Sequence, residues 1–455
     1  MTNSNNKRKA YALSLLAIST LILSACNQET KETTEPTSQY YTLPQITAQY
    51  DAQEVQDFNS RRNQGQTNRY ENLVIPNQLI LRQPDNLPSS LFYDSGIEIA
   101  YPADGVKGIY LTAENVANAE DFNYLVDFVN RTDLNAMVID FKDDYGNIIS
   151  VNESDNPTVQ SNTSAYLDYK EVLKVLEENN IYPIARIVTF KDHLYATEFP
   201  EHSFHDVYTG EIWEDGNGAR FINPFSQEVW DYTLDIAIEA AKMGFKDIQF
   251  DYVRFPEGFE SFEDTLDYDL GRFSAYQSDD PENYGEERVI AITQFLAYAK
   301  EQLAPYGVDV SADVFGYTAV AGNSPDVRGI GQNFARMAEE VDAISAMIYP
   351  SHWGTEFFGI LYPDLNPFET IDEYMYSEES ALANVQNDVI SRPWIQDFTD
   401  MYSNPDGAWQ YYGVEEVQEQ VDALTKHGVN EFLLWNAAGV YTEGVDYTPY
   451  EETAQ

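Results

Sequence analysis

The sequence predicts an α/β protein, a (β/α)8 barrel of the TIM type. From Gly108 onward, short apolar strands alternate with amphipathic helical stretches, which is typical of a parallel sheet with helical crossovers. Eight strands of this kind precede residue 447, the number that such a barrel needs. An open doubly wound sheet is the alternative. It is disfavoured because no Gly-rich phosphate turn follows the first strand and because polar residues end nearly every strand.

Periodicity places each element along the chain. The expected strands are Gly108–Thr112, Ala136–Phe141, Tyr182–Phe190, Asp247–Phe255, Asp309–Phe315, Ala343–Tyr349, Pro393–Phe398 and Glu431–Asn436. The expected helices between them are Ala119–Asn130, Tyr169–Asn179, Gln227–Met243, Glu287–Leu303, Phe334–Val341, Glu378–Ile390 and Val414–His427.

The N-terminus has the pattern of an export signal. Three basic residues, Lys7 to Lys9, precede an apolar run from Ala10 to Ala25 that is short for a membrane span. The run ends in Leu-Ser-Ala-Cys, which resembles the bacterial lipobox, whose Cys is modified with lipid. We therefore expect residues 1–25 to be a lipoprotein signal peptide and Cys26 to carry the lipid. An uncleaved anchor helix with an incidental Cys is the alternative.

This start of the chain predicts the domain organisation and the location. Residues 26–100 are expected to hold the lipidated Cys, a polar tether and an N-terminal extension; residues 101–447 form the barrel and residues 448–455 a tail. The protein would then be anchored at the extracellular face of the cell membrane. Cys26 is the sole cysteine, so the mature chain has no thiol for a disulfide or a thiolate metal site.

The charge and the aromatic content limit the class of partner. The chain has 26 basic and 76 acidic residues, a formal net charge of −50, which repels nucleic acid. Aromatic residues make up 14% of it, including 33 Tyr, whereas disordered acidic chains are poor in aromatics. We expect a folded monomer that binds no nucleic acid and presents some rings at its surface.

Three carboxylates lie within apolar strands, near the ends that would form an active site in such a barrel. They are Asp140, Asp251 and Asp313, in the second, fourth and fifth strands. An aspartate within an apolar strand is costly unless it is paired or solvated. Each could cap a loop or pair with Lys142, Arg186 or Arg254. For all three together, a catalytic site is the favoured interpretation.

Paired carboxylates beside aromatic rings are what glycosidic bond cleavage uses. One carboxyl protonates the leaving oxygen, the other attacks the sugar or activates water, and rings stack on sugar C–H surfaces. Arg186 and Arg254 are expected to set carboxylate ionisation. The candidate substrate-binding residues are Arg186, Arg254, Tyr349, His352, Trp353, Gln396 and Trp435.

Other chemistries have weaker support. The five His form no His-x-His or His-Glu-x-x-His motif, and no Gly-x-Ser-x-Gly is present. His202 and His205 lie in a loop, where a surface role is the simpler interpretation. We expect no catalytic metal and no cofactor. The segment from Phe259 to Glu287 is acidic enough to host a structural calcium, although solvation of the rim is the simpler interpretation.

Several stretches together resemble a bacterial family of glycosyl hydrolase domains. They are residues 108–112, 135–143, 185–188 with 190–192, 221–232, 244–245, 248–256 and 347–353, and the resemblance covers nearly all of 105–445. The family is similar in outline to the α-amylase-like barrels, whose nucleophile ends strand four and whose acid/base ends strand five. That resemblance implies that Asp251 is the nucleophile and Asp313 the acid/base. Asp313 stands where a Glu is usual in that larger group.

The resulting hypothesis is a glycoside hydrolase that cleaves an extracellular or cell-wall polysaccharide. Asp140 would stabilise charge or hold a sugar hydroxyl. The alternative is a glycan-binding surface lipoprotein that keeps the barrel without catalysis. A solute-binding lipoprotein of a transporter would need two lobes and a hinge, and the continuous run of eight strands argues against it.

Overall fold

The computed structural model describes residues 92–403 and 408–448. The expected signal peptide, Cys26 and the polar tether lie outside these described residues. Within them, no helix is long and apolar enough to cross a bilayer.

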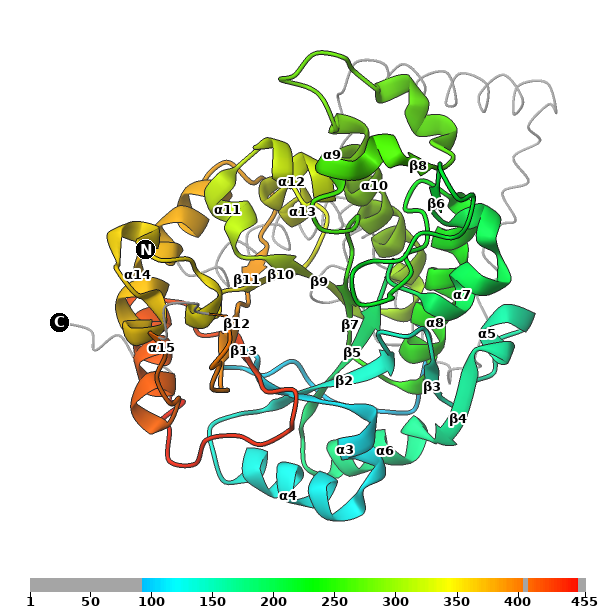
Figure 1. Cartoon of the computed structure of the whole chain (residues 1–455). Helices are drawn as coiled ribbons and strands as arrows, with labels where there is room; N and C mark the ends of the chain where they lie inside the picture. Colours follow the sequence, from blue (N-terminus) through cyan, green and yellow to red (C-terminus); the bar gives the residue numbers. More distant parts are fainter. Residues whose placement is uncertain (1–91, 404–407, 449–455) are drawn as a thin grey trace, which may run out of the picture. The chain divides into compact units, whose positions relative to one another are not determined.

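The centre of the fold is a closed barrel of eight parallel strands, seen along its axis in Figure 1. Neighbours follow the order β1-β2-β5-β7-β9-β10-β12-β13, and β13 pairs with β1 to close the ring. The strands are β1 Lys107–Leu111, β2 Ala136–Lys142, β5 Tyr182–Val188, β7 Asp247–Asp251, β9 Asp309–Phe315, β10 Ala343–Met347, β12 Trp394–Gln396 and β13 Phe432–Trp435. The predicted (β/α)8 barrel is confirmed, and each expected strand contains or overlaps one of the eight.

Helices follow the strands and form an outer ring around the barrel (Figure 1). They are α3 Ala113–Ala117, α4 Ala119–Asn130, α5 Pro157–Ser161, α6 Tyr169–Glu178, α7 His193–Glu198, α8 Gln227–Met243, α9 Phe259–Phe262, α10 Glu286–Leu303, α11 Tyr317–Ala321, α12 Pro325–Ile330, α13 Phe334–Ala338, α14 Pro367–Leu382 and α15 Val414–Lys426. Minor strands extend the sheet as β3 Ile148–Ser150, β4 Thr163–Leu167 and β11 Ile390–Ser391, while β6 His205–Asp206 pairs with β8 Leu266–Asp267.

One predicted helix, Glu378–Ile390, was wrong in position. The helix there is α14, which begins at Pro367, because proline suits the first helical turn, where its missing N–H is not needed. It ends at Leu382. The next residues run back toward the barrel because the Asn387 side chain donates to three backbone carbonyls, those of Ala338, Glu339 and Val341.

The core has two layers, as a barrel surrounded by helices requires. All seven residues of β2 and all seven of β5 are buried, which explains their continuous apolar sequence. Outside the sheet, Phe141 packs against Tyr169 and Phe245 at ring-centroid distances of 6.0 and 5.9 Å. Burial of each such ring contributes about 1.5–3 kcal/mol.

A buried ionic network closes the N-terminal end of the barrel. Arg392 donates to Asp247 at 2.7 Å and to Glu431 at 2.9 Å, and Ser311 donates to Asp247 at 2.6 Å. Asp247 and Asp251 are the first and last residues of β7. This network therefore lies at the opposite end of the barrel from the C-terminal strand ends, where sites on this fold form.

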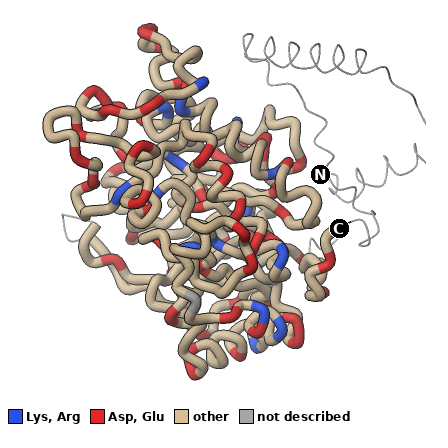
Figure 2. Tube along the Cα trace, turned by 90° about the vertical axis from the view of Figure 1, so that its right-hand side faces the viewer, with Lys and Arg blue, Asp and Glu red and all other residues tan. Residues whose placement is uncertain are grey.

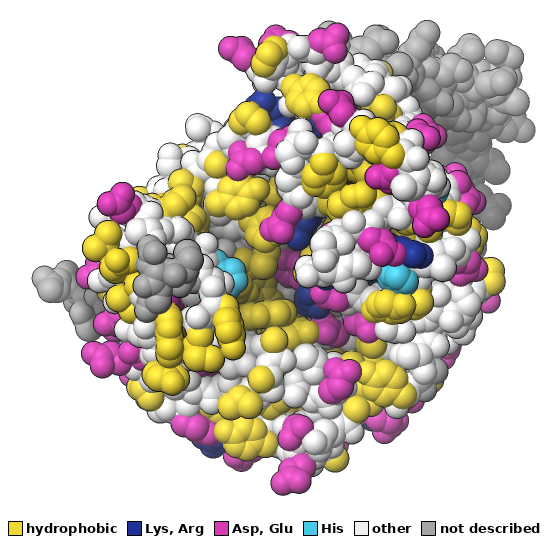
Figure 3. Space-filling model, viewed as in Figure 1, with side chains coloured by type: hydrophobic (Ala, Val, Ile, Leu, Met, Phe, Trp, Pro, Cys, Tyr) yellow, Lys and Arg dark blue, Asp and Glu magenta, His cyan; other side chains and the backbone are white. Residues whose placement is uncertain are grey.

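In Figure 2, acidic positions are scattered along the visible trace and outnumber basic ones. Sites on this fold form at the face where the C-terminal ends of the strands lie. Figure 3 shows this face hollowed at its centre, with hydrophobic, acidic and basic side chains around the hollow.

Candidate active site

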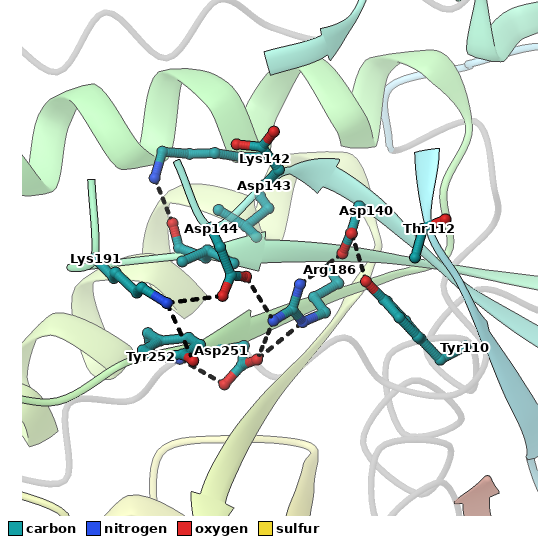
Figure 4. Close-up of polar contacts among 12 residues, drawn as sticks. Tyr110, Thr112, Asp140, Lys142, Asp143, Asp144, Arg186, Lys191, Asp251 and Tyr252 are labelled. Atoms are coloured by element: carbon teal, nitrogen blue, oxygen red, sulfur yellow. Dashed lines mark hydrogen bonds and ion pairs between the residues drawn. The ribbon is translucent and has the colours of Figure 1, made fainter. Parts of the chain in front are cut away.

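Arg186 on β5 is the centre of the site, between Asp140 on β2 and Asp251 on β7 (Figure 4). Its Nη1 donates to Asp140 Oδ1 at 2.6 Å. Its Nε and Nη2 both donate to Asp251 Oδ2, at 2.8 and 2.6 Å. Burial alone would lower the pKa of Arg186, but the two carboxylates raise it well above its ordinary value. The guanidinium therefore stays charged and fixes both side chains.

Strand pairing explains why these three residues meet. Asp140 is directly opposite Arg186, and Asp251 is opposite Val188, two residues further along β5. Alternate residues of a strand point the same way, so Asp140, Arg186 and Asp251 all face into the barrel. A β-bulge follows Asp140, because the pairing register with β5 shifts between Asp140 and Lys142.

Both carboxylate oxygens of Asp251 accept hydrogen bonds. Besides the two Arg186 donors on Oδ2, the backbone N–H of Tyr252 donates to Oδ1 at 2.6 Å. Tyr252 has a φ of 47°, a left-handed conformation that is unusual for a bulky residue. Such strain is found where a site holds its backbone in one geometry. Asp251 is 7% exposed, so its oxygens are close to the surface of the hollow.

Asp140 is held from the other side by Tyr110 of β1. The Tyr110 hydroxyl donates to Asp140 Oδ2 at 2.6 Å, so both oxygens of Asp140 have a donor. Burial raises the pKa of Asp140 to about 6, although the charge of Arg186 opposes this. Asp140 therefore has no free oxygen for proton transfer and fits a positioning role better than an acid/base role.

Asp313 on β9 is more deeply buried than Asp251 and accepts fewer hydrogen bonds from the described residues. It is 2% exposed, and burial together with the negative charge of Asp251 raises its pKa well above the ordinary range. Trp394 Nε1 donates to Asp313 Oδ1 at 2.7 Å. Because an indole only donates, Oδ1 must accept, and the proton belongs on Oδ2. Oδ2 has no hydrogen-bond partner among the described residues and is not sealed from solvent.

Asp251 and Asp313 are next to one another. The register pairs Phe250 with Ala312, so these two aspartates are the next residues on neighbouring strands. Parallel strands are about 4.8 Å apart, which brings both carboxyls within reach of one small group. Asp251 accepts three hydrogen bonds, whereas burial beside Asp251 raises the pKa of Asp313. Two carboxyls in such unlike surroundings are how acid and base roles are divided in carboxylate enzymes.

Aromatic rings surround this pair. Tyr110 stacks on Trp435 with centroids 4.2 Å apart and an interplanar angle of 18°. Trp394 meets Trp435 edge to face at 5.4 Å, and Arg186 lies 5.5 Å from the Tyr110 centroid. The charges of Asp313 and Asp251 act on the buried Tyr349 and help burial to raise its pKa. This ring therefore also lies near the pair.

A loop pair, Asp144 and Lys191, extends the network toward solvent (Figure 4). Asp144 accepts from Arg186 at 3.2 Å and from Lys191 at 2.9 Å. Burial would raise the pKa of Asp144, but these two cations lower it below its ordinary value. Lys191 Nζ is also 4.5 Å from the Tyr252 ring centroid, so the loops after β2, β5 and β7 are tied together.

The structure brings Asp140, Arg186, Asp251, Asp313, Tyr349 and Trp435 together, as the sequence predicted. It gives other candidates different surroundings. Gln396 is fully buried. Its side-chain oxygen accepts a hydrogen bond from the Ser351 N–H and its side-chain nitrogen donates to the Phe398 carbonyl, so it fixes the segments that contain these two residues. Trp353 packs against Phe357, Phe358 and Tyr374. His352 is exposed beside Tyr349 and Phe398.

Two basic residues differ from their expected roles. Lys142 forms a fully buried ion pair with Asp192 at 2.9 Å and also donates to the Val188 carbonyl at 2.6 Å. It therefore does not neutralise Asp140. Arg254 has no ion pair with a described carboxylate, so Arg186 alone of the two arginines sets carboxylate charge.

Sequence reasoning missed Tyr110, Asp144, Lys191, Tyr252 and Trp394. Tyr110 and Trp394 lie within strands that were predicted, and alternation along the seventh strand puts Trp394 on the same face as Gln396. Asp144 and Lys191 come from loops, where no periodicity applies. Within the described ranges, no group of three or more His, Cys, Asp or Glu side chains is arranged to hold a metal.

This geometry agrees with the comparison with protein families. Residues 108–441 match the family described as "Putative glycosyl hydrolase domain". The match extends from β1 to beyond β13 and includes every residue of the site. The chain belongs to this family. A search of the curated proteins found no match.

Solved structures with a similar fold include glycosidases. The glycoside hydrolase domain of PgaB (BpsB) from Bordetella bronchiseptica is 14% identical, with 74% of this chain and 95% of that one covered and a TM-score of 0.51. At this identity the likeness shows the fold alone. A hypothetical protein from Ruminiclostridium thermocellum is 35% identical over 45% of this chain and 97% of that one, with a TM-score of 0.38. A maltogenic α-amylase from Thermotoga neapolitana is 11% identical, with 77% and 72% covered and a TM-score of 0.42.

Proposed function

We propose that this protein is a glycoside hydrolase in which Asp313 is the acid/base and Asp251 the nucleophile or the base that activates water. The observation that carries the proposal is the contrast between these neighbouring aspartates. Asp251 accepts three hydrogen bonds, two of them from a buried arginine, while Asp313 is buried beside it with a raised pKa.

The proposed chemistry uses that contrast directly. Asp313 Oδ2, protonated and without a partner among the described residues, donates its proton to the glycosidic oxygen as the bond to the sugar breaks. Asp251 faces the positive charge that develops on the sugar ring, and attacks the anomeric carbon or directs a water to it. Transfer of the proton leaves Asp313 as a carboxylate. If Asp251 has attacked the sugar, Asp313 takes a proton from the water that hydrolyses the glycosyl–Asp251 ester; if Asp251 has activated the water, Asp251 takes that proton and Asp313 regains its own from solvent.

Other residues orient the two catalytic groups and the sugar. Arg186 fixes Asp251 and Asp140, and Tyr110 fixes Asp140. Trp435, half-buried and stacked on the buried Tyr110, offers an apolar surface for a sugar ring, as aromatic side chains do in ligand sites.

The cellular setting is part of the proposal. The lipobox-like sequence ending at Cys26 supports a protein tethered to the outer face of the cell membrane. Its substrate would then be an extracellular or cell-wall polysaccharide within reach of the tether.

The test is a panel of bacterial and host polysaccharides incubated with the wild-type chain, Asp251→Asn and Asp313→Asn. Reducing-end release is the measurement. Asp127→Asn is the control, since Asp127 is an exposed side chain on α4 that pairs with Arg131. We expect the wild type and the control to cut at least one glycan and both site variants to be slower by about 100-fold or more. Binding without cleavage by the wild type would instead indicate a glycan-binding protein.

A further inference from the structure

Arg254 is a buried basic residue near the candidate active site, and the proposed mechanism gives it no role. It lies three residues beyond Asp251, where the chain leaves β7. Only 7% of it is exposed, and its one hydrogen bond runs from Nη1 to the Phe255 carbonyl at 3.1 Å. Nε and Nη2 have no partner among the described residues and are not sealed from solvent. The side chain is therefore a buried cation with open donors.

The lack of a carboxylate partner is unusual for this chain. Acidic residues outnumber basic ones by 76 to 26, and two other buried arginines, Arg186 on β5 and Arg392 between β11 and β12, each bind at least two carboxylates. Arg328, also buried and without an ion pair to a described residue, instead donates to three backbone carbonyls. A buried charge without a counter-ion is destabilising unless something else compensates it.

Aromatic rings compensate part of this cost and fix the position of the guanidinium. Its carbon lies 4.8 Å from the Tyr252 ring centroid and 4.6 Å from that of Phe315. Cation–π contacts of this kind stabilise the charge without using its N–H groups. Tyr252 follows Asp251, and Phe315 is two residues after Asp313, so Arg254 lies between the strand ends that carry the two proposed catalytic groups.

We propose that Arg254 is the binding subsite for an anionic group on the glycan, a carboxylate or a phosphate. This inference rests on the proposed function and specifies its substrate class as an acidic saccharide. The guanidinium presents its free N–H donors in a planar arrangement that matches a carboxylate or phosphate. Lys191 Nζ lies 4.5 Å from the centroid of the same Tyr252 ring but is paired with Asp144, so the unpaired cation at this ring is Arg254 among the described residues. Figure 3 shows basic atoms exposed within this hollow.

The net charge of −50 predicts how salt affects association with such a substrate. An anionic glycan is repelled by the surface as a whole, and salt screens that repulsion beyond about 8 Å at physiological ionic strength. The contact with the buried Arg254 is screened much less. Association with an acidic glycan should therefore become faster, not slower, when salt is raised to this level.

The experiment compares matched charged and neutral ligands by isothermal titration calorimetry. One arm uses oligogalacturonates and the same oligomers with their carboxyls reduced to alcohols. The other uses glucose 6-phosphate and glucose. The proteins are the wild-type chain, Arg254→Gln, Arg254→Lys and the control Arg131→Gln, an exposed arginine on the outer helical layer. Thermal melts verify that each variant is folded.

We expect the wild type and the control to prefer the charged member of at least one pair by about tenfold or more. Arg254→Gln should reduce that preference to near unity, and Arg254→Lys should retain part of it. The arm in which the preference occurs identifies the carboxylate or the phosphate. Absence of a preference in both arms, or its survival in a folded Arg254→Gln, overturns the subsite.

Failure of the subsite and failure of the proposed function give different results. Cleavage of glycans by the wild type with no preference for charge overturns the anionic subsite and leaves hydrolysis in place. If the wild type prefers the charged ligands but cleaves no glycan, the anionic subsite is supported and the proposed hydrolase function is refuted.

Discussion

Replacing Arg186 with Met would remove the cation that three carboxylates share while keeping a side chain of similar length. Asp251 would lose two hydrogen bonds, Asp140 one and Asp144 one. Because Arg186 is 3% exposed, water cannot replace these donors without rearrangement. The pKa of Asp140, already about 6 with Arg186 present, should rise further.

The size of the effect follows from the burial of the group. Removing one partner of a buried ion pair costs about 3–5 kcal/mol. In a domain of this size each kcal/mol lowers Tm by about 2 °C, so the expected loss is about 6–10 °C. Hydrolysis should fall by more than stability alone explains, because Asp251 would no longer be held toward the sugar. Part of the folding cost should disappear at low pH, where the unpaired carboxylates are protonated.

Arg392→Met is the matched control. Arg392 is also a buried arginine with two carboxylate partners, Asp247 and Glu431, but it lies at the opposite end of the barrel. We expect a similar fall in Tm and unchanged activity per folded molecule below the transition. Tm by circular dichroism and kcat/KM for a cleaved glycan are the two measurements. Equal loss of activity in both variants, or full activity in a folded Arg186→Met, would refute the assigned role of Arg186.

Three other predictions concern the buried groups around the site. Trp394→Phe removes a hydrogen bond that lowers the pKa of Asp313, so the pKa of Asp313 should rise. The basic limb of the pH–activity profile should then move to higher pH by about one unit. A shift to lower pH would count against Asp313 as the acid. The pKa of Asp140 is raised from 3.8 to about 6, so the stability it contributes is present below pH 3.8 and is lost as pH rises through 6. In denaturant titrations, the difference in stability between Asp140→Asn and the wild type should therefore move in favour of the variant by up to about 3 kcal/mol as pH rises from 4 to 7, on top of a pH-independent cost of losing the ion pair with Arg186, and parallel curves would disprove this. Gly146→Ala should cost at least about 2 kcal/mol in the same assay, because φ is 107° and the new Cβ would clash with Asp192 Oδ1; an unchanged midpoint would show that the loop moves freely.

The barrel could be predicted because its strands are buried on both faces. Such strands appear in the sequence as short apolar runs, and polar residues within them, such as Asp140 and Asp313, are conspicuous. Period-two alternation then placed Asp140 and Asp251 on inward faces, and the pairing of β2, β5 and β7 brings them to Arg186. The central ion network therefore follows from local pattern plus topology.

The remaining features depend on loops and on packing, which periodicity does not specify. Asp144 and Lys191 reach the network from segments after the strands. The Gln396 side chain forms hydrogen bonds with the backbone of Ser351 and Phe398. Trp353 packs against the rings of Phe357 and Tyr374. The unpaired state of Arg254 is likewise a property of its three-dimensional surroundings.

The measurement that tests the division of roles most directly is the response of Asp313→Asn and Asp251→Asn to the leaving group. The substrates are the natural glycan and a 2,4-dinitrophenyl glycoside of the sugar that the wild type releases. The dinitrophenolate leaves without protonation, so Asp313→Asn should be slow on the glycan and should recover most of its rate of bond cleavage on the aryl glycoside. Asp251→Asn should be slow on both substrates. Recovery by Asp251→Asn in place of Asp313→Asn would reverse the assignment, and wild-type rates in both variants would contradict the proposed active site.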